Sequence, residues 1–371
     1  MSRFASPLKL AFITATPQNT NQGSGTFVGN IHLIHQLRRQ GHTVDVITPT
    51  HPVGKLGSTA HRFLWNWQLQ PGQFQGYDLA IGLDMDGYTL AKRLDMPFIA
   101  YIHGIIADEA KFEQGRVRIA LELQARAEQR SVNRADLVIA TSQYSCQRLG
   151  KLYGYPASQI QIVPPPIDLS AWDAAIAAAR QTGEDFTATR PTVLCVGVQY
   201  PRKNVATLIR AAALLRTHIP DLEVRIASKG PEWANLRRLT AELQLENTVT
   251  FLGHLSYKEL VREYLRCQIF CLPSLQEGFG IVFAEAMATG KPIVASRSSS
   301  TPELIEDGIH GLLATPRDPE DLARKLARLL AAPEEAKQMG QAGRAKVKEF
   351  DVTLVAQQFS QLLSQMLISE Q

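Results

Sequence analysis

A loop with two glycines and two flanking glutamates carries the strongest chemical signal in the chain. Glu277 opens the run Glu277-Gly-Phe-Gly280, and Glu285 follows with seven residues between the two glutamates. An apolar run precedes the loop and a helical pattern follows it. Glycines there let backbone N–H groups at a helix N-terminus approach a phosphate. Glu285 could hold a ribose diol and Glu277 the hydroxyls of a sugar. An ordinary helix start with acidic residues in its first turns is the alternative.

Two adjacent cations form a second candidate site. Arg202 and Lys203 follow the apolar run 192–198. Open α/β sheets bind ligands at the C-terminal ends of their strands. There the two side chains could pair with a pyrophosphate and stabilise the charge that develops as a nucleotide leaves. Solvated surface cations are the alternative.

Candidates in the first half are fewer. His103 ends the apolar run 98–103, and Gly104 follows it. A lone histidine is usually structural, but this strand-end position favours a functional role. Asp84-Met-Asp86 follows the run 79–83 and has the spacing of a metal-binding DxD triplet, a short pattern that is common by chance. We expect these carboxylates to line an acceptor pocket, and we predict no metal site.

The run Gly23-Ser-Gly25-Thr-Phe-Val-Gly29 resembles a dinucleotide-binding loop, and Asp45 lies about twenty residues beyond it. However, its glycines stand about nine residues past the preceding strand, whereas a dinucleotide-binding loop makes a tight turn directly after the strand. Asp45 also lies inside the next apolar run. A nicotinamide-dependent dehydrogenase is therefore disfavoured.

Bulk properties restrict the function class. The chain has 371 residues and a formal net charge of +4, with Lys and Arg scattered among Asp and Glu. This suits a small anionic ligand and argues against nucleic acid. No stretch approaches the ~20 apolar residues of a membrane span, and the N-terminus has too short an apolar core for a signal peptide, so we expect a cytoplasmic protein. Buried free thiols are expected at Cys146, Cys195, Cys267 and Cys271.

The arginine-rich amphipathic stretch 109–130 is expected to be a solvated face. Its interleaved acidic residues dilute the basic face, so weak peripheral membrane association is only left open.

Alternating apolar runs and helical patterns predict an α/β fold with parallel sheets. The helical pattern 29–40 follows the first run. This alternation is interrupted at 171–190, so we predict a first domain at 1–187, a second at 188–350 and a terminal helical segment at 351–371. The predicted strands are 8–14, 43–48, 79–83, 98–103, 137–141, 161–164, 192–198, 223–227, 249–252, 269–273, 292–295 and 311–314.

Together these motifs resemble the family-4 retaining glycosyltransferases, the group 1 glycosyltransferases. Besides the glutamate pair and its loop, the resemblance includes Glu285-Ala-Met-Ala-x-Gly290-x-Pro292, Arg202-Lys203-Asn204, Val249-x-Phe-Leu-Gly253, Pro302-Glu303 and Asp307-Gly308-x-x-Gly311. It is thinner in the first half, where Gly41-His42-x-Val44, His103-Gly104 and Arg134-Ala-Asp136 carry it.

The resemblance implies the GT-B architecture, with two Rossmann-like domains facing across a cleft and the last helix returning to the first domain. It implies metal-independent, retaining transfer of a hexose-type sugar from a nucleotide diphosphate sugar to a glycan, lipid or small-molecule acceptor, with no cofactor. It assigns catalytic roles to His103, Arg202, Lys203 and Glu277. It places Gly25, Thr26, Arg202, Lys203, Gly253, Glu277, Gly278, Phe279, Gly280, Ile281 and Glu285 around the donor.

Three departures from the family pattern leave the base and the sugar open. Val198 stands where many members carry arginine, so Arg202 could supply the missing guanidinium. Ser299 and Ser300 replace a glycine pair, and Ser228-Lys229-Gly230 replaces another. A nucleotide-sugar epimerase of the same fold and a non-catalytic nucleotide-sugar-binding protein remain the rival interpretations.

Overall fold

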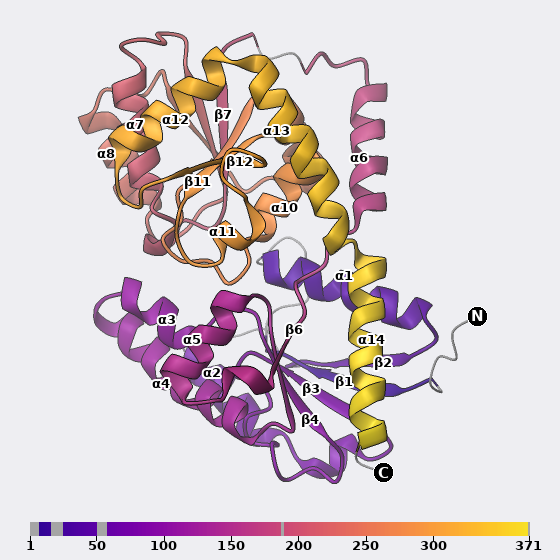
Figure 1. Cartoon of the computed structure of the whole chain (residues 1–371). Coiled ribbons are helices and arrows are strands. Elements are labelled where there is room, and N and C mark those ends of the chain that lie inside the picture. Colours follow the sequence, from indigo (N-terminus) through magenta and orange to yellow (C-terminus); the bar gives the residue numbers. More distant parts are fainter. Residues whose placement is uncertain (1–6, 16–24, 50–57, 187–188, 370–371) are drawn as a thin grey trace. The chain divides into compact units, whose positions relative to one another are not determined.

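The computed structural model describes residues 7–15, 25–49, 58–186 and 189–369. The chain divides into two compact units. Unit 1 comprises Met1–Pro166 and Val352–Gln371, and unit 2 comprises Ile167–Asp351. Each unit contains a six-stranded sheet, and all neighbouring strands that pair do so in parallel (Figure 1).

Unit 1 has the strand order β2-β1-β3-β4-β5-β6. Its strands are β1 (Lys9–Ile13), β2 (Thr43–Ile47), β3 (Leu79–Leu83), β4 (Phe98–Ile102), β5 (Leu137–Ala140) and β6 (Ile160–Ile162). Its helices are α1 (Gly25–Arg39), α2 (Ser58–Gln68), η1 (Pro71–Phe74), α3 (Ile106–Glu109), η2 (Ala110–Phe112), α4 (Gly115–Arg134), α5 (Gln143–Tyr153), η3 (Ala157–Gln159) and α14 (Val352–Ser369).

Unit 2 has the strand order β12-β11-β10-β7-β8-β9. Its strands are β7 (Thr192–Val196), β8 (Glu223–Ala227), β9 (Val249–Gly253), β10 (Ile269–Leu272), β11 (Ile293–Ser296) and β12 (Gly311–Ala314). Its helices are α6 (Leu169–Gln181), η4 (Pro201–Lys203), α7 (Val205–Leu215), α8 (Trp233–Glu242), α9 (Tyr257–Arg266), α10 (Ile281–Ala288), α11 (Thr301–Leu304), α12 (Pro319–Ala331), α13 (Pro333–Lys346) and η5 (Val347–Phe350).

The predicted α/β class is confirmed. Each of the twelve predicted apolar runs overlaps one of these strands, because a strand covered on both faces must be apolar at successive positions. In β1, Leu10 and Phe12 enter one hydrophobic cluster, while Ala11 and Ile13 enter the cluster on the other face. The four cysteines are buried and free, as expected.

Two local expectations differ from the structure. The first helix begins at Gly25, ahead of the predicted 29–40 segment, because a glycine in a first turn does not prevent helix formation. Residues 169–181, expected within the first domain, form α6 of unit 2. Trp172 of α6 packs edge-on against Tyr257 and Tyr264, with ring centroids 5.4 Å and 5.6 Å away.

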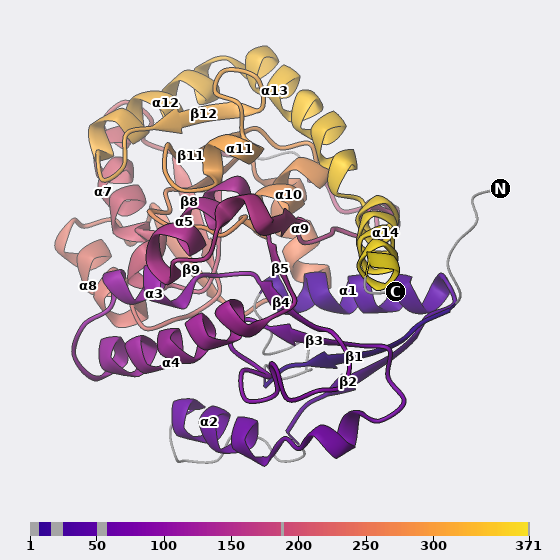
Figure 2. The ribbon, with the colours of Figure 1, turned by 60° about the horizontal axis from the view of Figure 1, so that its bottom comes forward.

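The last helix, α14, completes the core of unit 1. Its buried Val355, Ala356, Phe359 and Leu363 share a cluster with Phe12 of β1 and with α1, beside which α14 runs in both ribbon views (Figures 1 and 2). The Phe359 ring lies 6.2 Å from that of Phe12 and 5.7 Å from that of Tyr101. None of the described helices is both long and apolar enough to cross a membrane.

We expect Phe359→Ala to lower the free energy of unfolding of unit 1 by about 3–5 kcal/mol, because a fully buried ring leaves a cavity. Leu354→Ala on the exposed side of the same helix is the control, with a change within about 0.5 kcal/mol. Urea denaturation measures both. Equal effects of the two substitutions would show that α14 does not complete this core.

Candidate functional site

The candidate site of unit 2 lies where the strand order reverses. The first strand, β7, pairs with β10, with Val193 opposite Ile269. The chain continues from β7 through β8 to β9 on one side, and from β10 through β11 to β12 on the other. Loops that leave two such neighbouring strands in opposite directions open a crevice at the strands' C-terminal ends. Loop 197–204 follows β7, and loop 273–280 follows β10.

A buried ion pair joins these two loops. The Lys203 ammonium lies 2.6 Å from Oε1 of Glu277, and the two side chains are only 13% and 6% exposed. The Ser274 hydroxyl donates to the same oxygen at 2.6 Å. Burial opposes ionisation of Glu277, but the charges of Lys203 and Arg202 and these hydrogen bonds keep its pKa below the usual value. Glu277 is therefore held as a carboxylate.

The serines that replace the family's glycines hold the backbone of Glu277. Its N–H donates to Oγ of Ser299 at 2.9 Å, and its carbonyl accepts from the Ser300 hydroxyl at 3.0 Å. The Ser298 hydroxyl donates to the Ser274 carbonyl at 2.7 Å. The loop after β11 thus fixes the loop after β10. From the sequence, Ser299 and Ser300 were identified only as departures from the family pattern, and the contact of Ser274 with Glu277 was not predicted.

Arg202 takes a different place from its neighbour. It is half-buried, its Nη1 donates to the Gln276 carbonyl at 3.4 Å, and its guanidinium lies 5.4 Å from the centroid of the Tyr200 ring. Asn204 is left-handed and donates to the Pro273 carbonyl at 3.2 Å, which ties the two loops together again. The two residues of the predicted basic pair therefore have different partners. Lys203 contacts the buried carboxylate, and Arg202 contacts the backbone next to it.

Glu285 lies in α10, half-buried, and its Oε2 accepts from the Tyr264 hydroxyl at 2.9 Å. Burial raises the pKa of Glu285 to about 7, although the Tyr264 hydrogen bond opposes the shift. Gly280 precedes α10 with φ +91°, and a Cβ there would lie 2.5 Å from the Phe283 ring, so this position requires glycine.

The other loop residues show how α10 begins. Phe279 is buried and packs edge-on against Phe350 at 5.1 Å, so its ring belongs to the core. Ile281 is half-buried at the first helical position, next to Gly278-Phe279-Gly280. The first N–H groups of α10 have no carbonyl one turn earlier within the helix to bond. This N-terminus can attract an anion.

Residues at the C-terminal ends of β8 and β9 lie at the same edge of the unit 2 sheet. Gly253 ends β9 with φ +72°, and its carbonyl accepts from the Ser228 N–H at 2.6 Å. A Cβ on Gly230 would lie 2.4 Å from the backbone nitrogen of Gln199, so only glycine fits in this turn. The Lys229 ammonium lies over the Trp233 ring, 5.2 Å from its centroid. The altered Ser228-Lys229-Gly230 segment thus places a cation and an aromatic ring near Gly253.

In unit 1, the two aspartates of the DxD triplet have separate roles. Asp86 is fully buried and accepts two bonds from Arg62, at 2.8 Å and 3.0 Å, one from Asn66 at 3.0 Å and one from the Ala15 N–H at 2.7 Å. It therefore does not line a pocket as expected, because these donors occupy its oxygens. Asp84 is 23% exposed and accepts from the His103 N–H at 2.9 Å.

The His103 side chain is buried at the end of β4. Its Nδ1 lies 3.7 Å from Oδ1 of Asp84, and its ring lies 4.1 Å from that of Tyr101. Among the described residues, neither ring nitrogen has a hydrogen-bond partner. Burial opposes ionisation of Asp84, but the neighbouring His103 and the Arg62 charge hold its pKa below the usual value.

Gly25 and Thr26 belong to the first turn of α1, but the side chain of Thr26 lies outside the described residues, as do residues 16–24. Within the described ranges, no three His, Cys, Asp or Glu side chains gather as a metal site would require. The metal-free reaction stays a prediction.

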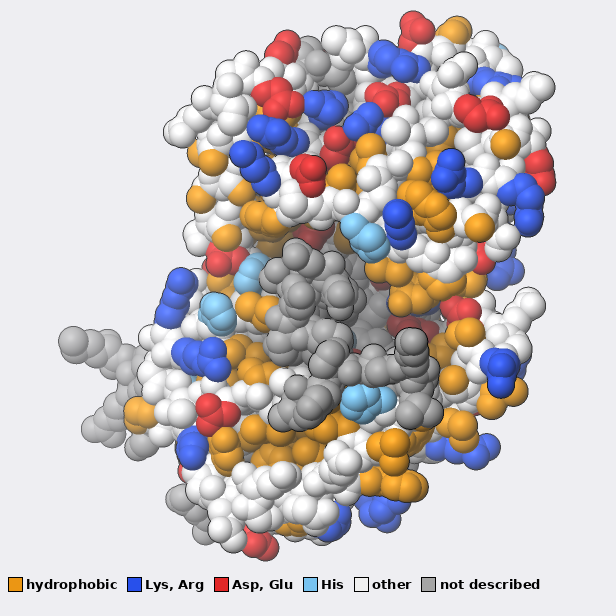
Figure 3. Space-filling model, turned by 180° about the vertical axis from the view of Figure 1, so that it is seen from behind, with side chains coloured by type: hydrophobic (Ala, Val, Ile, Leu, Met, Phe, Trp, Pro, Cys, Tyr) orange, Lys and Arg blue, Asp and Glu red, His pale blue; other side chains and the backbone are white. Residues whose placement is uncertain are grey.

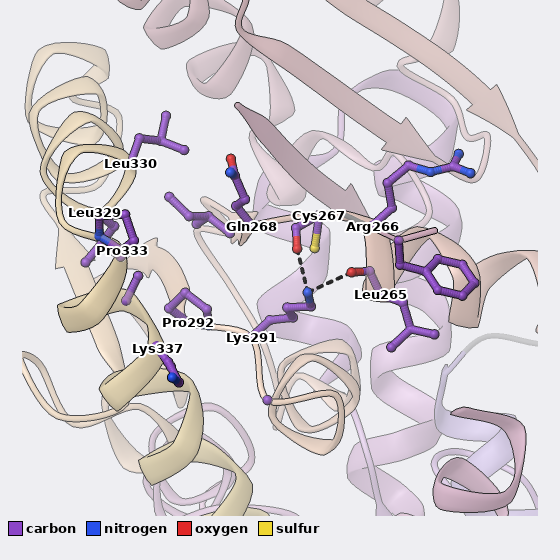
Figure 4. A pocket seen from close by; sticks show the side chains of 14 residues that line it. Leu265, Arg266, Cys267, Gln268, Lys291, Pro292, Leu329, Leu330, Pro333 and Lys337 are labelled. Carbon is purple, nitrogen blue, oxygen red and sulfur yellow. Dashed lines mark hydrogen bonds between the residues drawn. The ribbon is translucent and has the colours of Figure 1, made fainter. Parts of the chain in front are cut away.

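A hollow of about 350 Å³ lies at the opposite edge of the unit 2 sheet, near Ile269, the first residue of β10, and Pro292, which directly precedes β11 (Figure 4). The Lys291 ammonium donates there to the carbonyls of Leu265, at 2.9 Å, and Cys267, at 2.6 Å. These are carbonyls at the end of α9, so Lys291 caps that helix. The hollow is separate from the candidate site.

We expect Lys203→Met to lower the free energy of unfolding by about 3 kcal/mol or more, because it leaves the Glu277 carboxylate buried without its partner. The double substitution Lys203→Met with Glu277→Gln should recover most of the loss. Lys346→Met, which breaks an ion pair with the 62% exposed Glu349, is the control and should change it by less than about 1 kcal/mol. If the double variant is no more stable than the single one, the pair is not the cause.

Comparison with known proteins agrees with this geometry. Residues 23–171 match the family model described as Glycosyltransferase Family 4, and residues 181–346 match the model described as Glycosyl transferases group 1. A GDP-mannose-dependent alpha-(1-6)-phosphatidylinositol monomannoside mannosyltransferase of Mycolicibacterium smegmatis is 32% identical over 220 residues, which cover 57% of each chain. A D-inositol 3-phosphate glycosyltransferase of Mycolicibacterium vanbaalenii is 31% identical over 261 residues, 66% of this chain and 57% of the relative. The match thus spans little more than half the length of these relatives.

Solved structures share the fold. Sucrose-phosphate synthase from Thermosynechococcus elongatus superposes with a TM-score of 0.82 at 23% identity, covering 98% of this chain and all (100%) of the other. The Anabaena protein HepE, in complex with UDP and glucose, gives 0.73 at 21% identity, covering 96% and 99%. With two family models that together match most of its length, and two parallel-sheet units of the GT-B type, the chain belongs to the group 1 glycosyltransferases of family 4.

Proposed function

We propose that this protein is a retaining glycosyltransferase that transfers a hexose-type sugar from a nucleotide diphosphate sugar to a glycan, lipid or small-molecule acceptor. The observation that carries the proposal is the joining of two loops at the switch point of unit 2, where Lys203 holds Glu277 ionised beside Arg202. Two similar proteins support a nucleotide-sugar donor, since one relative is GDP-mannose-dependent and HepE was solved with UDP and glucose.

In the proposed reaction the donor diphosphate lies between the N-terminus of α10 and the two cations. The partial positive charge of the helix end and the Arg202 guanidinium stabilise the negative charge that grows on the phosphate as the bond to the sugar breaks. The acceptor hydroxyl forms the new bond on the same face of the sugar. Its proton passes to the leaving phosphate oxygen, so no second protein carboxylate is required.

The two glutamates have different proposed partners. Ionised Glu277 accepts hydrogen bonds from hydroxyls of the transferred sugar, while Glu285 accepts from the ribose diol of the nucleotide. The difference in their electrostatics supports this division. Glu277 is held charged by cations, whereas Glu285 has only the Tyr264 hydroxyl and is neutral or charged near neutral pH.

We further propose that unit 1 holds the acceptor and that His103 contributes to the transfer step. A buried imidazole whose ring nitrogens have no hydrogen-bond partner among the described residues, and whose backbone Asp84 fixes, supports a role toward a bound molecule.

The test of the function uses the full chain with GDP-mannose and UDP-glucose in excess EDTA. We expect one of these donors to bind and to be turned over without metal. Arg202→Ala should weaken donor binding about tenfold to a hundredfold, because a charge-assisted bond is lost. Arg237→Ala, on an exposed position of α8, is the matched control and should change nothing.

Unchanged affinity in the Arg202 variant would contradict the assignment of the phosphate site. Activity lost in EDTA and restored by Mn²⁺ would contradict the metal-free reaction. Conversion of the donor to an epimer without acceptor would identify an epimerase. Binding without turnover with any acceptor would identify a non-catalytic binding protein.

A second prediction concerns pH. If Glu285 must be ionised to hold the ribose, affinity for the bare nucleoside diphosphate should fall as the pH drops below about 7, by up to about tenfold per unit. The affinity falls as the pH is lowered because protonation of Glu285, whose pKa is raised, competes with binding of the diol. Calorimetry from pH 5.5 to 8.5 should show this dependence in the wild type and its loss in Glu285→Gln. The variant also corrects for titration of the phosphate itself.

His103→Ala is the second control for this series, since it should leave nucleotide affinity unchanged while lowering kcat by about 10²-fold. A pH dependence that is identical in the wild type and in Glu285→Gln would remove Glu285 from the nucleotide site.

A further inference from the structure

The hollow beside Ile269 and Pro292 lies at the edge of the unit 2 sheet where the strands start, and we call it the strand-start hollow. Phe186 and four segments of unit 2 line it: the stretch from α9 to β10 at 265–269, the turn from α10 to β11 at 290–292, the end of α12 and the start of α13. Its volume of about 350 Å³ lies within the range of about 300–1,000 Å³ that small-molecule sites occupy. The candidate site lies at the other edge, where the strands end. The function proposed above therefore leaves this hollow without a role.

The walls of the strand-start hollow are mostly apolar and already in close contact behind it. Leu265, Ile269 and Leu329 are buried members of the unit 2 core, and each contributes to the lining. A Cβ on Gly340 of α13 would lie 2.0 Å from the carbonyl oxygen of Gly290. The backbone of α13 therefore touches the turn after α10, and this contact keeps α13 from moving inward. A small apolar molecule would find a preformed space here.

Two lysines bring positive charge to the hollow, as Figure 4 shows from close by. The half-buried Lys291 donates to the carbonyls of Leu265 and Cys267, at 2.9 Å and 2.6 Å. An ammonium group has three donors, and only two of those of Lys291 have acceptors among the described residues. Lys337 of α13 is exposed and forms no ion pair within the described part of the chain. One donor of Lys291 and the charge of Lys337 are therefore available to a bound anion.

No carboxylate in the described lining offsets these charges. Neither Asp nor Glu is among the described residues that surround the hollow. The third cation of the lining, Arg266, is already paired, with Glu184 at 2.8 Å and with Glu263 at 3.5 Å. On the face of unit 2 that Figure 3 shows, Lys and Arg side chains are instead interspersed with Asp and Glu. The hollow thus combines an apolar wall with an excess of positive charge.

We propose that the strand-start hollow binds a small organic anion with a carboxylate on an apolar body, such as a medium-chain fatty acid. The apolar body lies against Leu265, Ile269 and Leu329, where it is removed from water. The carboxylate accepts a charge-assisted hydrogen bond from Lys291 and attracts the ammonium of Lys337. A free sugar fits poorly, because its hydroxyls would be buried against hydrocarbon without partners. The proposal is independent of the reaction proposed for the other edge of the sheet.

Isothermal titration calorimetry of the full chain, with octanoate as the probe, tests this assignment. We expect saturable binding with a Kd of about 1 mM or below. Three further compounds separate the contribution of the apolar body from that of the charge. Octan-1-ol has the same body without the charge and should bind about tenfold more weakly. Octylamine has the opposite charge, acetate lacks the body, and neither should bind.

Two substitutions test whether the probe lies in the hollow. Lys337→Gln removes one of the two charges and should weaken octanoate binding about fivefold, with no effect on octan-1-ol. Ala336→Phe fills the space from α13 and should abolish the binding of both. The matched controls are Lys258→Gln, at an exposed position near the other end of α9, and Ala345→Phe, at an exposed position of α13. Both controls should bind octanoate as the wild type does.

Four results would overturn the proposal. One is the absence of saturable octanoate binding at millimolar concentrations. Another is octan-1-ol binding as tight as that of octanoate, which would show that the lysines contribute nothing. The third is unchanged binding in folded Ala336→Phe, which would place the probe elsewhere. The last is equal loss in Lys337→Gln and Lys258→Gln, which would identify a non-specific effect of charge.

Circular dichroism of each variant establishes that folding is retained. If Ala336→Phe does not fold, the comparison of Lys337→Gln with Lys258→Gln decides, because both substitutions change exposed side chains.

Discussion

A carboxylate buried at the reversal of the unit 2 sheet is the constraint on which the candidate site depends. Glu277 is buried, and an unpaired charge there would be strongly destabilising. Lys203 and the Ser274 hydroxyl satisfy its side chain, while Ser299 and Ser300 hold its backbone. The loops after β7, β10 and β11 therefore take one mutual geometry, and Arg202 and the start of α10 take their places beside it.

Unit 1 also has a buried carboxylate at the reversal of its sheet, but with different partners. There the reversal lies between β1 and β3, and buried Asp86 accepts from the Ala15 backbone just after β1 while Arg62 neutralises it. Asp84, two residues earlier, holds the backbone of His103 after β4. In unit 1, carboxylates after one strand thus fix the main chain after two others, whereas in unit 2 the carboxylate bonds side chains and serine hydroxyls hold the main chain. The residues left half-exposed beside these bonds are the ones available to a ligand.

The fold was largely predictable, and the partners within the site were not. Strands β3, β8 and β12 begin and end where their apolar runs do, since turn residues flank runs that must be buried on both faces. The placement of α6 could not be predicted, because it depends on Trp172 meeting Tyr257 and Tyr264 far along the chain. The same holds for Asp86, whose role as a structural bridge depends on Arg62 and Ala15. Local sequence indicates which residues can be charged, but it does not indicate which long-range donor occupies each oxygen.

The ion pair also limits how a donor can bind. Lys203 cannot give its full charge to a diphosphate while it lies 2.6 Å from Glu277, because the two anions would compete for one ammonium. If the phosphates drew Lys203 away, Glu277 would keep its low pKa only by gaining new donors, since only the Arg202 charge and the Ser274 hydrogen bond would then oppose the effect of burial. Sugar hydroxyls are donors of the right kind. In the proposed reaction, phosphate binding and sugar binding are therefore coupled through one carboxylate. A nucleotide that lacks the sugar satisfies the cations without satisfying Glu277, so this site favours the complete donor over the spent nucleotide.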